Sequence, residues 1–276
     1  MLLNKFINTK IVCIKGGLGN QLFCYCRYRQ LKEKYDGTVY LFYDYRRMKE
    51  HGGIKLQQCF DIQLPHCPFY IFIFVLLIKL LQIIHLFPSL YDINSNDSIL
   101  IDDFSQEKKY ITKASEWLSF RHQDYGKEWL NYAESIKQSS YSVAIHVRRG
   151  DYLHPSNIDN FGVCNTEYYK KAISIINNIH NDASYFIFSD DMEWTISNLN
   201  FINKATYITF ENHIPDHAEL QLMTLCNAHI IANSTFSFWG AYLHNIEEAI
   251  NIYPKRWYKA QEWDNPNIFP DNWIAI

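Results

Sequence analysis

The segment "YSVAIHVRRGDYLHP", residues 141–155, joins an apolar run to a group of charged residues. The run up to His146 is typical of a buried strand, and two arginines, a glycine and an aspartate follow it. Arginine is rarely buried without a partner, and its planar guanidinium makes paired hydrogen bonds to phosphate or carboxylate. Arg148 and Arg149 therefore predict either a diphosphate site at a strand end, or an ion pair with Asp151 beside a solvated surface charge.

Composition limits the classes of protein to consider. The chain has 276 residues, with 26 Lys and Arg against 29 Asp and Glu, so its formal charge is -3. That length suits one large or two modest domains, and the charge gives no general nucleic-acid footprint. Seven cysteines without a C-x-x-C pair argue against a metal cluster or a disulfide framework. Residues 1–10 are polar and do not fit a signal peptide. Together with the cysteine pattern, they indicate a cytoplasmic protein.

The order of apolar runs predicts an α/β fold in two halves. Residues 10–43 read as a strand, a glycine-rich turn, a helix and a second strand, which is the repeating unit of parallel sheets. A second series of alternating strands and helices begins at Ser142. We expect an N-terminal half of residues 1–135 and a C-terminal half of residues 136–276. Ligands of such folds bind at the carboxyl ends of the strands.

Two turns at these strand ends are candidate anion sites. "GGLGNQ" at 16–21 is neither a P-loop nor a G-x-G-x-x-G motif, so it is either an ordinary turn or a backbone approach to a ligand at a helix start. "NSTFSFWG" at 233–240 places hydroxyls at a predicted helix N-terminus. Those hydroxyls would either cap the helix or bind phosphate.

Carboxylates follow other predicted elements. Asp190 and Asp191 come directly after a buried strand, where they would cap the next helix, bind a metal, or accept hydrogen bonds from guanine N1–H and N2–H. No D-x-D pattern occurs in the chain, which gives a metal-bridged diphosphate little support. Asp216, followed three residues later by Glu219, fits a capping box, with a catalytic role for Asp216 as the alternative.

The segment "FYIFIFVLLIKLLQIIHLF", residues 69–87, is strongly apolar. Lys79, Gln82 and His85 recur every three residues and would share one helical face. That polar stripe favours a helix that lies on a membrane surface or packs against the protein over one that spans a bilayer, which needs about 20 mainly apolar residues.

The order of the motifs resembles one family. "GGLGNQLF" at 16–23, "HVRRGDY" at 146–152, "FSDD" at 188–191 and "ANSTFSFWG" at 232–240 are similar to motifs of glycosyltransferase family 11, the α-1,2-fucosyltransferases. The resemblance covers about residues 10–275, and we expect a member of the bacterial kind, without the N-terminal membrane anchor of animal members.

The resemblance implies a GT-B-like fold, with two Rossmann-like α/β halves facing a cleft. It implies an inverting transfer from GDP-fucose to a galactose-terminated glycan, without a metal or other cofactor. The N-terminal half, including residues 69–87, would form the acceptor side, and the C-terminal half would bind the GDP-sugar. Peripheral contact with the inner face of a bacterial membrane would run through residues 69–87.

The resemblance also implies roles for individual residues. Arg148 matches the arginine that binds the donor's β-phosphate, and Arg149 would support the loop or the fucose side. Asp151 is the first candidate for the general base and Asp216 the second. The implied donor-binding residues are Gly17, Gly19, Asn20, His146, Arg148, Arg149, Asp190, Asp191, Ser234, Thr235 and Ser237.

Three functions remain open from the sequence alone. The first is α-1,2-fucosyl transfer to a galactoside during surface-glycan or O-antigen assembly. The second is another fucosyl linkage, such as α-1,6, because the donor motifs do not separate linkages. The third is a non-catalytic, membrane-associated GDP-sugar-binding protein.

Overall fold

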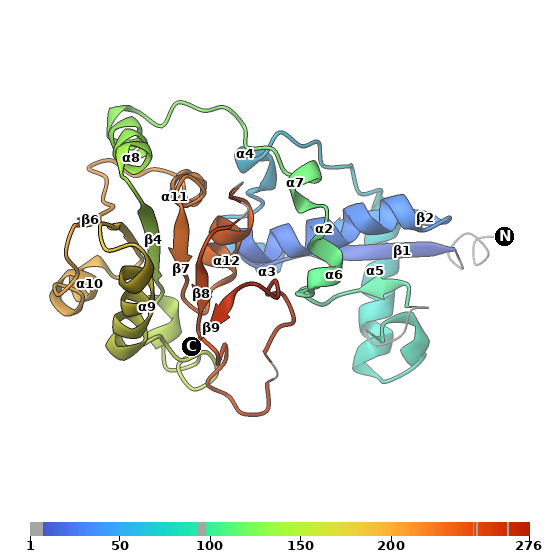
Figure 1. The fold of residues 1–276 in the computed structure, drawn as a ribbon. Coiled ribbons are helices and arrows are strands. Elements are labelled where there is room, and N and C mark those ends of the chain that lie inside the picture. Colours follow the sequence, from blue (N-terminus) through green and yellow to red (C-terminus); the bar gives the residue numbers. More distant parts are fainter. Residues whose placement is uncertain (1–7, 93–97, 245, 247, 264) are drawn as a thin grey trace. The chain divides into compact units, whose positions relative to one another are not determined.

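The chain forms two compact units, Met1–Arg121 and His122–Ile276 (Figure 1). The structure is a computed structural model that describes residues 8–92, 98–244, 246, 248–263 and 265–276. The sequence suggests a boundary at residue 135, but α8 (Lys127–Gln138) packs against α11 (Asp216–Met223) and so belongs to the second unit. Residues 1–7, which form most of the stretch tested for a signal peptide, lie outside the described residues.

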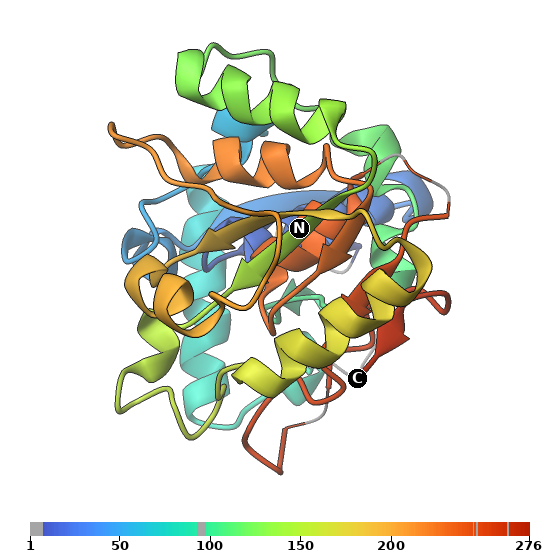
Figure 2. The same ribbon diagram turned by 60° about the vertical axis from the view of Figure 1, so that its left-hand side comes forward.

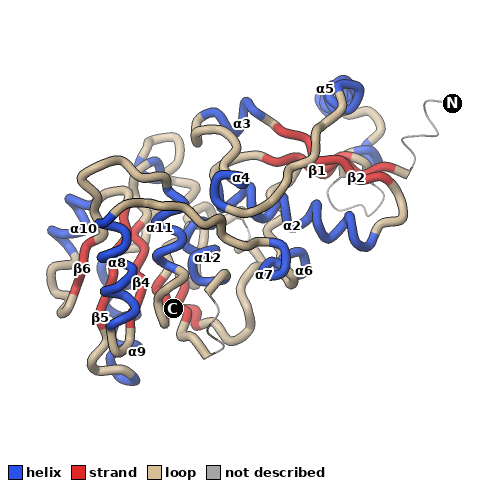
Figure 3. The backbone as a smooth tube through the Cα atoms, turned by 90° about the horizontal axis from the view of Figure 1, so that it is seen from above, coloured by secondary structure: helices blue, strands red, loops and turns tan. Residues whose placement is uncertain are grey.

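The first unit is a three-stranded parallel sheet in the order β2-β1-β3. The helix α2 packs on one face and α5 on the other (Figure 3). In chain order the elements are β1 (Thr9–Ile14), α2 (Leu18–Lys34), β2 (Thr38–Tyr43), α3 (Tyr45–Lys49), α4 (Leu56–Cys59), α5 (Phe69–Ile83), the 3-10 helix η1 (Pro88–Leu90), β3 (Leu100–Ile101), α6 (Lys108–Ile111) and α7 (Ala114–Trp117).

The predicted strand–turn–helix–strand unit at the start of the chain is confirmed. Every residue of β1 is buried, and its partner β2 runs parallel to it. The chain leaves β1 through Gly16, whose φ of +74° is a left-handed conformation that glycine adopts without strain. Gly17 then precedes α2, and no side chain caps this helix.

The second unit is a six-stranded parallel sheet in the order β6-β5-β4-β7-β8-β9. Counted from β4, this is the 3-2-1-4-5-6 order of doubly wound dinucleotide-binding folds, so the strand order reverses between β4 and β7. Its elements are α8 (Lys127–Gln138), β4 (Ser142–Val147), the 3-10 helix η2 (Asp151–Leu153), α9 (Thr166–Ile179), β5 (Ser184–Ser189), α10 (Met192–Asn198), β6 (Ala205–Tyr207), α11 (Asp216–Met223), β7 (Ala228–Ile230), α12 (Thr235–Tyr242), β8 (Asn251–Tyr253) and β9 (Ile274–Ala275).

Both faces of this second sheet are covered by helices. Figure 2 shows α9 on one side of the strands and α11 with α8 on the other. Alternation along β4 divides the core: Val143 and Ile145 pack with α9, whereas Ala144 packs with α8 and α11. His146 lies on the Ala144 side because side chains alternate along a strand, and its ring lies 5.8 Å from that of Phe236. A near-continuous apolar strand buried on both faces is the pattern expected of a parallel sheet.

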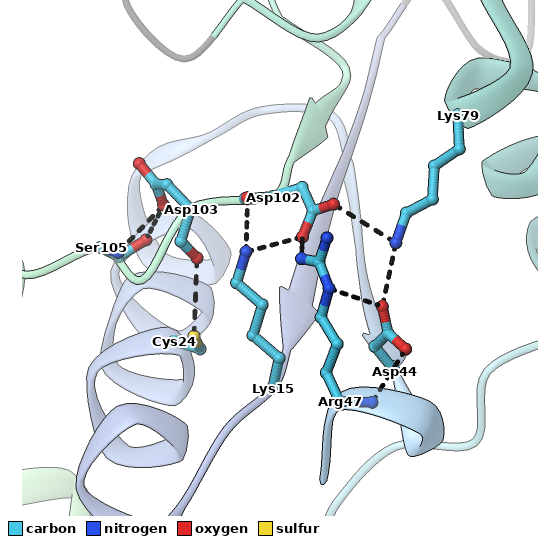
Figure 4. Close-up of polar contacts among 8 residues, drawn as sticks. All are labelled: Lys15, Cys24, Asp44, Arg47, Lys79, Asp102, Asp103 and Ser105. Carbon is cyan, nitrogen blue, oxygen red and sulfur yellow. Dashed lines mark hydrogen bonds and ion pairs between the residues drawn. The ribbon is translucent and has the colours of Figure 1, made fainter. Parts of the chain in front are cut away.

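A charged cluster closes the carboxyl edge of the first sheet. Lys15, Asp44 and Asp102 are the residues that directly follow β1, β2 and β3, and Arg47 and Lys79 join them from α3 and α5 (Figure 4). Asp102 Oδ1 lies 2.8 Å from Lys15 Nζ and 3.1 Å from Arg47 Nη1. Lys79 Nζ lies 3.0 Å from Asp44 Oδ2 and 3.3 Å from Asp102 Oδ2. Three cations therefore share two carboxylates at the strand ends.

The pKa values of this cluster show that attraction outweighs burial. Burial raises the pKa of Asp102, but the hydrogen bond from Lys15 and the charges of the nearby cations lower it by more. The net pKa is therefore below its ordinary value. Burial likewise raises the pKa of Asp44, and the hydrogen bond from Lys79 reverses the direction. Both carboxylates therefore stabilise the folded state when ionised, and this stabilisation is lost as the pH falls through their lowered folded-state pKa values.

The predicted polar stripe on the apolar segment is wrong. Lys79 points inward to Asp44 and Asp102, Gln82 is exposed, and His85 lies beyond the end of α5 with a φ of +55°. The spacing in the sequence predicts one common face for the three polar residues. In the structure, only Lys79 pairs with the carboxylates at the edge of the sheet. None of the described helices has both the length and the apolar composition that a membrane span requires.

We predict that Asp102→Asn lowers the free energy of unfolding by about 3–5 kcal/mol, because it leaves two largely buried lysines without a shared carboxylate. Urea unfolding measures this change. The control is Glu107→Gln, whose partner Lys109 is 60% exposed and whose loss should cost less than about 1 kcal/mol. Equal effects of the two substitutions would contradict a structural role for the cluster.

Candidate functional site

Arg148 lies at the carboxyl end of β4, where the strand order of the second sheet reverses. Its Nη2 atom lies 2.6 Å from Asp151 Oδ1, and its Nη1 atom lies 2.9 Å from Asp190 Oδ2. Asp190 follows β5, which pairs in register with β4 up to Val147 and Ser189. The predicted ion pair with Asp151 is therefore present, and Asp190 adds a second partner that the sequence did not indicate.

Arg149 is held differently from its neighbour. Its Nε atom lies 3.0 Å from Asp191 Oδ2, and its guanidinium stacks 3.8 Å from the centre of the Trp194 ring. Asp191 also caps α10 by accepting a hydrogen bond from the Trp194 N–H. Arg149 therefore fixes the loop after β4 to α10, and the alternative of a solvated surface charge is wrong.

Gly150 allows the loop after β4 to close on Asp190. A Cβ atom at Gly150 would lie 2.6 Å from Asp190 Oδ2, closer than real Cβ contacts. The other oxygen of Asp190 accepts a hydrogen bond from the Arg149 N–H at 2.8 Å. Glycine here lets one carboxylate bind both the backbone and the Arg148 side chain.

Two buried polar atoms near this loop have no hydrogen-bond partner among the described residues. They are His146 Nδ1 and Arg148 Nε. Burial, and then the charge of Arg148, lower the pKa of His146 to about 3, so its imidazole is neutral at physiological pH. Buried polar groups in folded proteins are nearly always paired, so two unpaired atoms at a strand end are typical of a ligand site.

The start of α12 lies beyond the neighbouring strand β7. Ser234 precedes the helix and Thr235 begins it, yet no side chain caps the helix. The first backbone N–H groups of a helix have no carbonyl partner within it, so they can bind an anion. Ser237 is buried, and its hydroxyl donates to the carbonyls of Ala232 and Ser234. Its hydroxyl is therefore used within the turn.

Asn233 and Tyr152 connect the loops of this edge. Asn233 Nδ2 donates to the carbonyls of Phe161 and Trp257, at 3.1 and 3.0 Å, and Tyr152 Oη donates to the Asn233 carbonyl. No sequence pattern predicted a role for either residue. Their contacts hold the loops after β4, β7 and β8 together, so the residues support the site.

Glu219 is a titratable residue for which the sequence pattern predicted only a capping role. Burial raises its pKa to about 7, and the charges of Asp216 and Asp190 add to this effect. The capping-box interpretation is wrong, because Pro215 precedes α11 and no side chain caps the helix. Glu219 is thus a partly buried carboxyl with a pKa near neutrality. Its charge interacts with that of Asp190, the partner of Arg148.

The glycine-rich loop of the first unit carries the remaining predicted residues, Gly17, Gly19 and Asn20. Gln21, which is fully buried, donates to the carbonyls of Gly16 and Gly53 and so fixes this loop. Asn20 Oδ1 accepts a hydrogen bond from Gln106 at 2.9 Å. The loop is rigidly tied, with the uncapped start of α2 beside it.

The cysteines and acids form no metal centre in the part of the chain that the structure describes. No group of three or more His, Cys, Asp or Glu residues is placed to hold a metal ion there. The metal-independent reaction stays a prediction.

A doubly wound parallel sheet with an arginine and an uncapped helix start at its switch point defines an α/β fold of the kind that binds ligands at the carboxyl ends of its strands. The solved structure of NodZ α-1,6-fucosyltransferase soaked with GDP-fucose shares the fold, with a TM-score of 0.50 and 11% identity, over 89% of this chain and 94% of that chain. The predicted GT-B α/β fold is confirmed.

The family model "Glycosyl transferase family 11" matches residues 102–276, which is more than half of the chain. The chain therefore belongs to glycosyl transferase family 11, as the motifs indicated, and is a glycosyltransferase. It is similar to an α-1,2-colitosyltransferase of Escherichia coli, at 29% identity over 95% of this chain and 97% of the relative. It is also 32% identical to the O-antigen biosynthesis glycosyltransferase WbnK of Escherichia coli, over 52% of this chain and 48% of the relative.

We predict that Glu219→Gln stabilises the protein increasingly as the pH rises. The folded-state pKa of about 7 lies above the ordinary 4.5, so the wild-type carboxyl lowers stability progressively between these values and fully above pH 7. Glutamine keeps the shape and removes the charge. Melting temperatures should therefore converge near pH 4.5 and favour the variant at pH 8.

The control for that measurement is Glu167→Gln, an exposed carboxyl in the first turn of α9. A difference between Glu219→Gln and wild type that is the same at every pH would contradict the raised pKa.

Proposed function

We propose that the chain transfers L-fucose from GDP-β-L-fucose to the 2-hydroxyl of a terminal galactoside, with inversion at the anomeric carbon, during assembly of a surface glycan such as O-antigen. The observation that carries the proposal is that the Arg148 guanidinium follows β4 and the uncapped start of α12 follows the neighbouring strand β7, on the two sides of the switch point. The family membership and the α-1,2 linkage in the name of one relative support the reaction class.

The same relative gives a second candidate donor. Its name states colitosyl transfer, and its similarity extends over 95% of this chain. Colitose is L-fucose without the 3-hydroxyl, so one diphosphate site would serve either sugar. The likeness to an α-1,6-fucosyltransferase concerns the fold alone at 11% identity, and so it does not favour that linkage.

The proposed role of Arg148 follows from the charge that develops on GDP. When the bond between sugar and phosphate breaks, the leaving diphosphate gains negative charge, and donors already aimed at that charge are usually the largest catalytic contribution. Asp151 and Asp190 hold the guanidinium from two sides. The side chain is therefore positioned before the substrate binds. The N–H groups at the start of α12 would provide further donors without a metal.

The second requirement is removal of a proton from the acceptor hydroxyl. Asp151 is the direct partner of Arg148, which suits it to holding the arginine. Glu219 has a pKa of about 7, and a base with a pKa near the working pH is the most effective. We therefore place the base at Glu219, ahead of Asp151 and Asp216.

The test of the proposed function is GDP release by the purified chain with GDP-fucose in EDTA, with and without lactose or N-acetyllactosamine. We expect release only when acceptor is present, with GDP-mannose inactive and the product linkage α-1,2 by NMR. The same GDP-release assay with GDP-colitose tests the second candidate donor. GDP binding without release from any donor would contradict catalysis, and release that stops in EDTA would contradict the metal-independent mechanism.

The base assignment predicts a change in the pH dependence of kcat. In the wild type, kcat should rise through about pH 7 as Glu219 ionises. In Glu219→Gln, kcat should fall by about 10²–10⁴-fold and lose that dependence. Asp216→Asn serves as the matched variant and should keep the rise, moved to lower pH because the charge of Asp216 no longer raises the pKa of Glu219. A Glu219→Gln profile that still rises near neutrality would move the base to another residue.

A further inference from the structure

The helix α5 exposes a large apolar face. Its buried side is formed by Ile71, Val75 and Ile78. Eleven large apolar side chains on the helix and the turn after it are between 42% and 75% exposed. They are Phe69, Tyr70, Phe72, Ile73, Leu76, Leu77, Leu80, Ile83, Ile84, Leu86 and Phe87. A contiguous apolar surface of this kind on a folded protein marks a site of interaction.

The exposed side chains follow helical geometry. Phe69, Ile73, Leu76, Leu80 and Ile83 recur at spacings of three and four residues and form one stripe along the helix. A helix of 15 residues is about 22 Å long, shorter than the hydrocarbon core of about 30 Å. The stripe therefore fits a surface on which the helix lies flat.

The apolar face is held in place from beneath. Lys79 is anchored to Asp44 and Asp102, as Figure 4 shows. Aromatic contacts with β2 add to this anchor, since Tyr40 pairs with Tyr70 and Phe42 with Phe72. The helix thus packs firmly on the sheet while its outer side stays open to solvent.

Cations outnumber acids beside this face, since Arg46 and Lys49 are exposed on α3, and one exposed acid, Glu50, stands at the end of that helix. Residues 62–91 contain no aspartate or glutamate, although the whole chain has a formal charge of -3. Beside the helix, Asp44 binds Lys79 and begins α3, on which Arg46 and Lys49 are exposed. Tyr45, also on α3, is 66% exposed. An apolar stripe next to exposed cations and an aromatic ring complements a surface of acyl chains and anionic headgroups.

We propose that α5, with the cations of α3, docks the first unit onto an anionic phospholipid surface. Pairing of two copies through the same face would bring like-charged α3 segments together, so the charge pattern favours a membrane over a second copy. The helix lies outside residues 102–276, which the family model matches, so the inference rests on this chain's own side chains. It is independent of the proposed sugar transfer.

The test is sedimentation of the full chain with vesicles at low ionic strength. We expect binding to phosphatidylcholine vesicles that contain phosphatidylglycerol, and weaker binding to phosphatidylcholine alone. Leu76→Glu with Leu80→Glu should weaken binding at least about tenfold, because two apolar contacts are lost. Arg46→Glu with Lys49→Glu should weaken it by about fivefold or more per charge on anionic vesicles only.

The matched control is Leu130→Glu with Ile179→Glu, two exposed apolar residues on α8 and α9, which should leave binding unchanged. All of the substituted residues are exposed, and the melting temperature checks that each variant is folded. Wild type that fails to sediment, or a control that loses binding equally, would overturn the proposal. A wild-type dimer in analytical ultracentrifugation that Leu76→Glu with Leu80→Glu converts to monomer would assign the face to a second copy instead.

Discussion

Parallel pairing of the strands is the constraint on which the two charged sites depend. In a parallel sheet every strand ends at the same edge, so residues far apart in the sequence meet there. In the first unit this brings together Lys15, Asp44 and Asp102, each directly after a strand. In the second unit it brings Asp190, after β5, against Arg148, after β4. Both clusters follow from topology and from the choice of residue at the strand end.

The two clusters differ in how completely their polar groups are paired. In the first unit, the carboxylates of Asp44 and Asp102 are shared among three cations, and the lowered pKa values of these carboxylates reflect that pairing. In the second unit, His146 Nδ1 and Arg148 Nε are buried without partners among the described residues. Unpaired buried atoms lower stability, so their place at the switch point of a glycosyltransferase fold is better explained by substrate binding than by folding. The first cluster therefore stabilises the fold, and we propose that the second binds the substrate.

The sequence predicted the strand ends better than the partners that gather there. Apolar runs and turns located β1, β4 and β5, because burial on both faces of a parallel sheet leaves a direct trace in composition. Glu219 was missed because its spacing from Asp216 imitates a capping box, whereas its raised pKa depends on burial by the folded chain. Lys79 was assigned to one polar face with Gln82 and His85, because periodicity gives the side of a helix but not the distant partners Asp44 and Asp102 of the lysine.

We propose that Arg148 stabilises the leaving diphosphate, and kcat for Arg148→Ala with GDP-fucose and a galactoside acceptor tests this role directly. Lys170→Ala, which removes an exposed cation of α9, is the matched control, and circular dichroism with the melting temperature shows whether each variant is folded. We predict that kcat falls by about 10²-fold or more in the folded Arg148→Ala variant and in Arg148→Lys, which keeps the charge but loses the planar fork. A kcat within about threefold of wild type in either folded variant, far short of the loss expected when such a donor is removed, would show that Arg148 does not stabilise the leaving diphosphate.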